Sequence, residues 1–156
     1  MCEKKLVTFE RSSDLVNLVG APVLVDPAEY AGIHHAGVAL TEDFGRVTRG
    51  NPNQFLHIHR TPQENLHLHT AIILGCVESC WMLKQLEEAG KIDPIEIRGK
   101  WESFMTAVVE HPIKECDKAL VIAGSDKRAA IFDACKLSNQ IGVSPYDVIP
   151  RRLGED

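Results

Sequence analysis

The hydrophobic positions of the sequence fall into short apolar runs that alternate with longer stretches of helical spacing. The short runs are rich in Val, Ile, Leu and Phe, and they predict strands at 6–9, 22–26, 55–59, 66–69, 71–74, 95–97, 101–109 and 119–123. Apolar residues three and four apart predict helices over 30–47, 78–88 and 126–140, which end near Gly50, Gly90 and Gly142. This alternation predicts an α/β fold, a single layered domain over residues 1–156 whose mixed, largely parallel sheet is flanked by helices.

Two of the predicted strands carry histidine at every second position. Residues 55–59 read FLHIH, residues 66–69 read LHLH, and a polar segment separates them, which predicts a hairpin or two neighbouring strands. Alternate residues of a strand share a face, and cross-strand neighbours lie about 5 Å apart. We therefore expect four imidazoles to converge, those of His57, His59, His67 and His69.

Four convergent imidazoles suit a zinc, nickel or copper ion, and they also suit proton transfer near neutral pH. The four histidines are therefore the candidate catalytic and metal-ligating residues, and a divalent metal is the one cofactor that the pattern suggests. The alternative is a polar, solvated face of the sheet. A shift of one residue in the strand register would also scatter the cluster.

A second candidate lies where the apolar run 119–123 leads into a predicted helix, at Ser125, Asp126, Lys127 and Arg128. Free backbone N–H groups and the helix dipole favour anions at such a place, and Arg128 can add a bidentate contact, so these four residues are candidates for binding a carboxylate. The alternative is structural, with Ser125 as the N-cap of the helix and Asp126 complementing its dipole.

Length and charge narrow the classes of function. The chain has 156 residues, enough for one core, whereas a (β/α)₈ barrel needs about 250 residues. A net charge of −5 without a long basic cluster argues against nucleic acid as a partner. We find no apolar stretch typical of a signal peptide or a membrane span, so we expect a cytoplasmic protein without a membrane partner. Five cysteines, an odd number, predict reduced thiols, and Cys76 and Cys80 are interpreted as small buried residues.

Motifs of one enzyme family follow one another along nearly the whole chain. They read VDPAEY at 25–30, DFGRVT at 43–48, AIILG at 71–75, GKID at 90–93, GKWESF at 99–104, VVEHP at 108–112, ALVIAGSDKR at 119–128 and QIGVSP at 140–145. In this order they resemble glycoside hydrolase family 115, the xylan α-1,2-glucuronidases. The resemblance is to the N-terminal α/β domain of these enzymes.

The resemblance implies that such a domain precedes a (β/α)₈ barrel, in an enzyme that removes glucuronic or 4-O-methylglucuronic acid with inversion. Inversion needs a general acid and a general base on the two sides of the sugar. The chain stops at Asp156, where the barrel would begin, and Lys136 and Asn139 stand where family members commonly carry acidic residues. Because the amide of Asn139 cannot transfer a proton and Lys136 reverses the charge at its position, we expect no glucuronidase activity.

These observations lead to one main hypothesis and two alternatives. The main hypothesis is a stand-alone accessory or partner-binding domain, in which a homo-oligomer or a protein partner covers the surface that the barrel would occupy. Trp81 and Trp101 are interpreted as core residues or interface anchors. One alternative is a repurposed small enzyme that uses the histidine face or the helix start on a small carbonyl or carboxylate substrate. The other is a truncated piece of a xylan glucuronidase.

Overall fold

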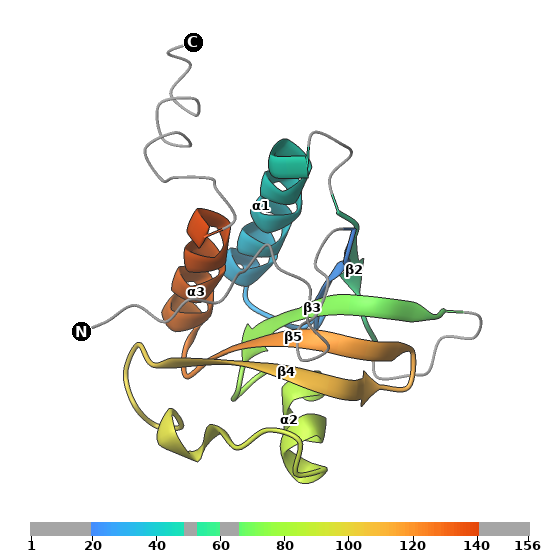
Figure 1. Ribbon diagram of the computed structural model, residues 1–156. Coiled ribbons are helices and arrows are strands. Elements are labelled where there is room, and N and C mark those ends of the chain that lie inside the picture. Colours follow the sequence, from blue (N-terminus) through green and yellow to red (C-terminus); the bar gives the residue numbers. More distant parts are fainter. Residues whose placement is uncertain (1–19, 49–52, 60–65, 141–156) are drawn as a thin grey trace, which may run out of the picture.

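A five-stranded sheet forms the centre of the molecule (Figure 1). The computed structural model describes residues 20–48, 53–59 and 66–140. Its elements are β1 (Val23–Val25), α1 (Ala31–Thr48), β2 (Phe55–His57), β3 (Leu68–Cys76), α2 (Trp81–Glu88), the 3₁₀ helix η1 (Pro94–Glu96), β4 (Phe104–Ile113), β5 (Cys116–Gly124) and α3 (Lys127–Gln140). The strand order is β2-β1-β3-β5-β4, with β4 antiparallel to β5 and the other pairs parallel. The predicted α/β fold with a mixed, largely parallel sheet is confirmed.

Helices cover both faces of this sheet, so the protein has three layers. Figure 1 shows α1 and α3 together on one face and α2 on the other. Between α2 and the sheet, Met82, Leu83 and Leu86 pack against the buried residues of one strand face. On the opposite side, a second apolar cluster joins Ile33 and Leu40 of α1 to the sheet and α3. Each layer is therefore held by its own core, and the central strands are buried on both faces, as parallel sheets require.

The predicted order of the histidine strands is wrong. Residues 66–69 and 71–74 belong to one continuous segment, most of which forms the single strand β3. This strand does not pair with β2. The short strand β1 lies between them, because Val23 pairs with Phe55 of β2 on one side and with Ile72 of β3 on the other. All three residues of β1 are buried, so this apolar segment belongs at the centre of the sheet and keeps the histidine-bearing strands apart.

The predicted strand at 95–97 is also wrong, because the chain forms η1 there. Pro94 occupies the first turn, where its fixed backbone angle suits a helix and no N–H is needed. The side chain of Asp93 caps this turn by accepting a hydrogen bond from the backbone N–H of Ile95 at 3.2 Å. The apolar Ile95 side chain that suggested a strand is exposed.

The outer strand β4 has an irregular end. The β4–β5 register shifts between Glu110 and Ile113, and His111 there has a φ of 50°. The ammonium of Lys91 donates to the backbone carbonyl of Glu110 at 3.4 Å and to that of His111.

The predicted strand at 6–9 and the motif at 141–145 lie outside the described residues. Within the described part of the chain, every helix is too short or too polar to cross a membrane.

Gly124, the last residue of β5, allows α3 to begin close to the sheet. A Cβ atom at this position would lie 2.4 Å from the backbone nitrogen of Ala130 and 2.7 Å from the carbonyl oxygen of Asp126. We expect Gly124→Ala to lower the free energy of unfolding by about 2 kcal/mol, because the clash is with backbone that cannot move aside. Urea denaturation measures this loss. The control Gly32→Ala, within α1, would meet only the end of the Ile131 side chain, at 2.9 Å, and should cost much less; equal losses in the two variants would contradict the prediction.

Candidate functional site

The four predicted histidines fall into separate places. His57 of β2 lies against α1, where its Nε2 is 3.0 Å from Nδ1 of His34. Nε2 of His34 is 3.1 Å from the carbonyl oxygen of Glu29, and a carbonyl only accepts, so this nitrogen carries the proton. In this tautomer Nδ1 of His34 accepts from Nε2–H of His57. His59 is exposed just beyond β2, and β1 separates both from His67 and His69. A pocket lined by all four imidazoles is therefore not formed.

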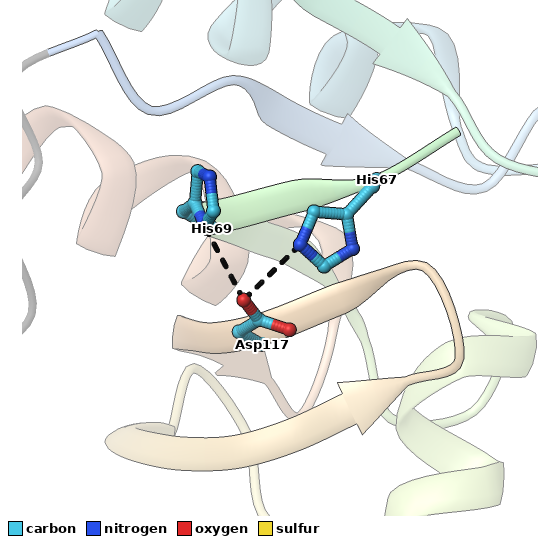
Figure 2. Close-up of side chains that lie close together, drawn as sticks. All are labelled: His67, His69 and Asp117. Carbon is cyan, nitrogen blue, oxygen red and sulfur yellow. Dashed lines mark hydrogen bonds and ion pairs between the residues drawn. The ribbon is translucent and has the colours of Figure 1, made fainter. Parts of the chain in front are cut away.

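His67 and His69 instead gather around a carboxylate of the neighbouring strand. Figure 2 shows both rings directed toward Asp117 of β5. Oδ2 of Asp117 lies 3.3 Å from Nε2 of His67 and 3.3 Å from Nδ1 of His69. The two imidazole rings are perpendicular, with centroids 5.0 Å apart. Sequence reasoning missed Asp117, because its position beside these histidines depends on the pairing of β3 with β5.

The predicted anion site at the start of α3 already holds a carboxylate. Asp126, not Ser125, caps the helix, because its Oδ1 accepts from the backbone N–H of Ala129 at 2.9 Å. Its Oδ2 accepts from the N–H of Glu102 at 2.9 Å. These backbone donors, that of Glu102 foremost, lower the pKa of Asp126. An external carboxylate would have to displace this one.

The other members of that motif also have partners. Ser125 is buried and forms two hydrogen bonds with Ser103. The N–H of Ser125 donates to the carbonyl oxygen of Ser103 at 2.7 Å, and the N–H of Ser103 donates to Oγ of Ser125 at 2.9 Å. Arg128 forms an ion pair with Glu102 at 3.1 Å. Nζ of Lys127 lies 5.6 Å from the ring centre of Tyr30. The contacts of Ser125 and Arg128 fasten the segment before β4 to the start of α3, and that of Lys127 reaches the segment before α1.

Two buried acids lie at the carboxyl ends of β1 and β3, the place where open α/β sheets commonly bind ligands. Asp26 accepts from the backbone N–H groups of Ala28 at 2.8 Å and of Trp81 at 2.9 Å. Glu29 accepts from the N–H of Cys76 at 3.0 Å and from the hydroxyl of Ser79. Both carboxylates are thus used to hold the loop after β3 and the start of α2.

The cysteines beside these acids are structural. Cys76 and Cys80 are buried, as predicted. Burial raises the pKa of both thiols, that of Cys80 to about 12, so they stay protonated near neutral pH. Neither Cys76 nor Cys80 is therefore an activated nucleophile.

Exposed and half-exposed aromatic side chains lie on α3 and on the segment 101–104 that leads into β4. We call the α3 surface the group Trp101, Phe104, Arg128, Phe132 and Lys136. Trp101 is 81% exposed and Phe132 is 61% exposed, which excludes a core role for Trp101. The rings of Phe104 and Phe132 are 6.0 Å apart, and Nζ of Lys136 lies 5.1 Å from the centre of the Phe104 ring.

Trp81, the other tryptophan, is half-buried against the α2 core. Its indole Nε1–H donates to the carbonyl oxygen of Ile58 at 2.8 Å. It therefore joins α2 to the segment after β2 and leaves Trp101 as the candidate interface anchor.

The comparisons with known proteins agree with this fold. No protein-family model matches the sequence. No curated protein matches it either. Among solved structures, the chain is similar to a family GH115 4-O-methyl-α-glucuronidase with specificity for decorated arabinogalactans, with a TM-score of 0.60 and 26% sequence identity. The match covers 86% of this chain and 15% of that enzyme. The chain thus resembles an α/β domain of a glycoside hydrolase family 115 glucuronidase, as its motifs indicate.

Proposed function

We propose that this protein is an accessory, partner-binding domain of the glucuronidase type that does not itself hydrolyse glucuronides. The observation that carries the proposal is the α3 surface, where Trp101 and Phe132 present large apolar side chains to solvent. Phe104 and Phe132 are in ring contact, the segment that carries Trp101 is hydrogen-bonded to the start of α3, and exposed apolar groups of this kind are typical of protein interaction sites. Tryptophan and arginine, both present here, are the residues most enriched in interaction hot spots.

The buried acids support a non-catalytic role. Inverting hydrolysis of a glycoside requires two carboxyl groups about 6.5–9.5 Å apart with a sugar and a water between them. Asp26 and Glu29 accept hydrogen bonds from the protein's own backbone. The carboxylate of Asp126 is likewise used to cap α3. These groups are committed to holding loops and helix starts.

The partner that fits the α3 surface is the remainder of a family GH115-type protein. In the matched glucuronidase, the region similar to this chain is 15% of the polypeptide, so the other 85% (100 − 15) is available to pack against it. The same surface serves whether the partner is joined in one polypeptide, as in a piece of a longer glucuronidase, or is a separate chain.

Self-association of the isolated chain tests this surface. Without its partner, the α3 surface should pair with a second copy, so light scattering after size-exclusion chromatography should give a mass above that of a monomer at high concentration. The double variant Trp101→Ser/Phe132→Ser should be monomeric, because it removes the two most exposed aromatic side chains of the surface. The control Ile95→Ser, which changes a 71% exposed residue on η1, should associate as the wild type does.

Two outcomes would contradict the proposal. A wild-type chain that stays monomeric at high concentration would remove the evidence for an interaction surface. Release of 4-O-methylglucuronic acid from a decorated arabinogalactan by the purified chain would show that the domain is catalytic.

A further inference from the structure

We propose that His67, His69 and Asp117, the β3–β5 triad, form a binding site for a divalent transition-metal ion, with zinc as the expected ion. The sheet register places the three side chains together: Leu68 pairs with Cys116 and Thr70 with Lys118, so His69 and Asp117 occupy the positions in between. His67 lies two residues before His69, just before β3 begins, and its Nε2 is 3.3 Å from the same oxygen of Asp117. Figure 2 shows the two rings directed toward the carboxylate.

The distances within the triad match those between ligands of one metal ion. Zinc binds histidine nitrogen and carboxylate oxygen at about 2.0–2.2 Å, so two tetrahedral ligand atoms lie roughly 3.3 Å apart. Oδ2 of Asp117 is 3.3 Å from one nitrogen of each imidazole. All three ligand atoms lie within 4.8 Å of one another. Small rotations of exposed side chains therefore suffice to bring the two nitrogens to the same ion.

The donor set selects the kind of ion. Two imidazole nitrogens and one carboxylate oxygen suit zinc, nickel and copper, whereas calcium and magnesium prefer oxygen ligands alone. Three protein ligands leave a fourth tetrahedral position for water or for a group from a partner. Both histidines are exposed and Asp117 is half-exposed, so an ion reaches the triad directly from solvent.

The backbone beneath the triad is fixed, which limits the cost of ordering the ligands. Leu66 and Leu68 pack against the core on the opposite face of the chain, and Cys116 is buried there. The N–H of Leu68 donates to the carbonyl oxygen of Glu115 at 2.7 Å and ties the starts of β3 and β5 together. Ligands carried by paired strands are held more precisely than ligands on loops.

Zinc titration of the full chain, followed by isothermal calorimetry, tests this site. We expect one zinc ion per chain, with affinity at least tenfold weaker in His69→Ala and in Asp117→Asn. The matched control is His59→Ala, which removes an equally solvent-facing histidine that β1 separates from the triad; it should bind zinc as the wild type does. Cobalt(II) gives a second readout, because its visible absorption bands report coordination and should be lost with the triad variants.

Two outcomes would contradict the proposed metal site. A wild-type chain that binds no zinc would exclude the site, and equal losses in His59→Ala and His69→Ala would indicate scattered surface histidines. Unchanged urea unfolding of the metal-free variants establishes that any loss of binding is local. The association assay of the α3 surface is run with a chelator, so failure of the one proposal does not affect the other.

Discussion

Replacing Asp133 by asparagine is expected to stabilise the protein strongly at about pH 8 and to have little effect at about pH 4. Asp133 lies on α3 with no exposed surface, and neither of its carboxylate oxygens has a hydrogen-bond partner among the described residues. Burial raises the pKa of this carboxyl from 3.8 to about 7, against a smaller lowering by the charge of Lys136. A buried carboxylate without hydrogen bonds is costly when ionised, so the folded protein keeps this group neutral until the pH reaches its raised pKa.

The sign of the pH dependence follows from the raised pKa. Between pH 3.8 and about 7 the folded protein holds a proton at Asp133 that the unfolded chain has lost, so stability falls as the pH rises through this range. The difference between the two pKa values, at about 1.36 kcal/mol for each pH unit, corresponds to roughly 4 kcal/mol. Asparagine cannot ionise, so the variant should lose this part of the pH dependence and gain a few kcal/mol at about pH 8.

Urea denaturation at a series of pH values measures this effect. Asp43→Asn is the matched control, because Asp43 is a buried aspartate of α1 that has a partner, Arg46, at 3.1 Å. The control should show no gain in stability at about pH 8. An Asp133→Asn variant whose stability changes with pH as the wild type does would mean that Asp133 is ionised in the folded protein and stabilised there.

Removal of the Glu29 side chain is expected to be the most damaging substitution at the carboxyl end of the sheet. Glu29 is buried and accepts hydrogen bonds from the N–H of Cys76 and the hydroxyl of Ser79, and a longer one from the N–H of Tyr30 at 3.3 Å. Glu29→Ala leaves these donors without their acceptor and opens a cavity next to Gly75 and Cys80. Unpaired buried donors each cost about 1–3 kcal/mol, so we expect the free energy of unfolding to fall by about 3–4 kcal/mol.

Glu29→Gln separates the loss of the hydrogen bonds from the loss of packing. The glutamine oxygen can still accept from one donor, while its amide group faces the others, so this variant should lose about half as much stability as Glu29→Ala. Chemical denaturation of both variants gives the comparison. A loss below about 1 kcal/mol for Glu29→Ala would show that water replaces the carboxylate and that this acid does not hold the β3–α2 loop.

The helices and the central strand β5 were predictable because their patterns are local. Predicted helix 30–47 is confirmed by α1 at Ala31–Thr48, and predicted helix 126–140 by α3 at Lys127–Gln140. The run 119–123 lies within β5, where its apolar side chains are buried on both faces. In these segments the hydrophobic spacing and the turn residues agree with the final environment, so local reading succeeds.

The order of the strands was not predictable in the same way. The pattern of a histidine-rich segment does not show whether its strand pairs with the next strand along the chain or with a distant one. Here the three residues of β1 lie between β2 and β3. The contact of His69 with Asp117 joins residues 48 positions apart in the sequence. Nothing in the local pattern distinguishes Asp117 from the other acids, so two members of the β3–β5 triad, the histidines, were predicted and the third was missed.

The burial of Asp133 could not be predicted from the local sequence pattern, for a related reason. It stands between Phe132 and Ala134 on a helix whose exposed and buried faces both carry polar side chains. Only the packing of α3 against the sheet and α1 decides that this carboxyl is enclosed. The roles of Asp26 and Glu29 were missed as well, although an Asp-Pro pair directly after a buried strand is a signal of a structured turn.

The contact of Lys91 with the irregular end of β4 bears on the solubility of the protein. An outer strand offers its unpaired backbone groups to any neighbouring chain that can add a strand, which is a common route to aggregation. Here the ammonium of Lys91 occupies the carbonyls of Glu110 and His111, and the bulge bends the strand away from a straight template. We therefore expect a second molecule to add a strand less readily at this end of the sheet edge.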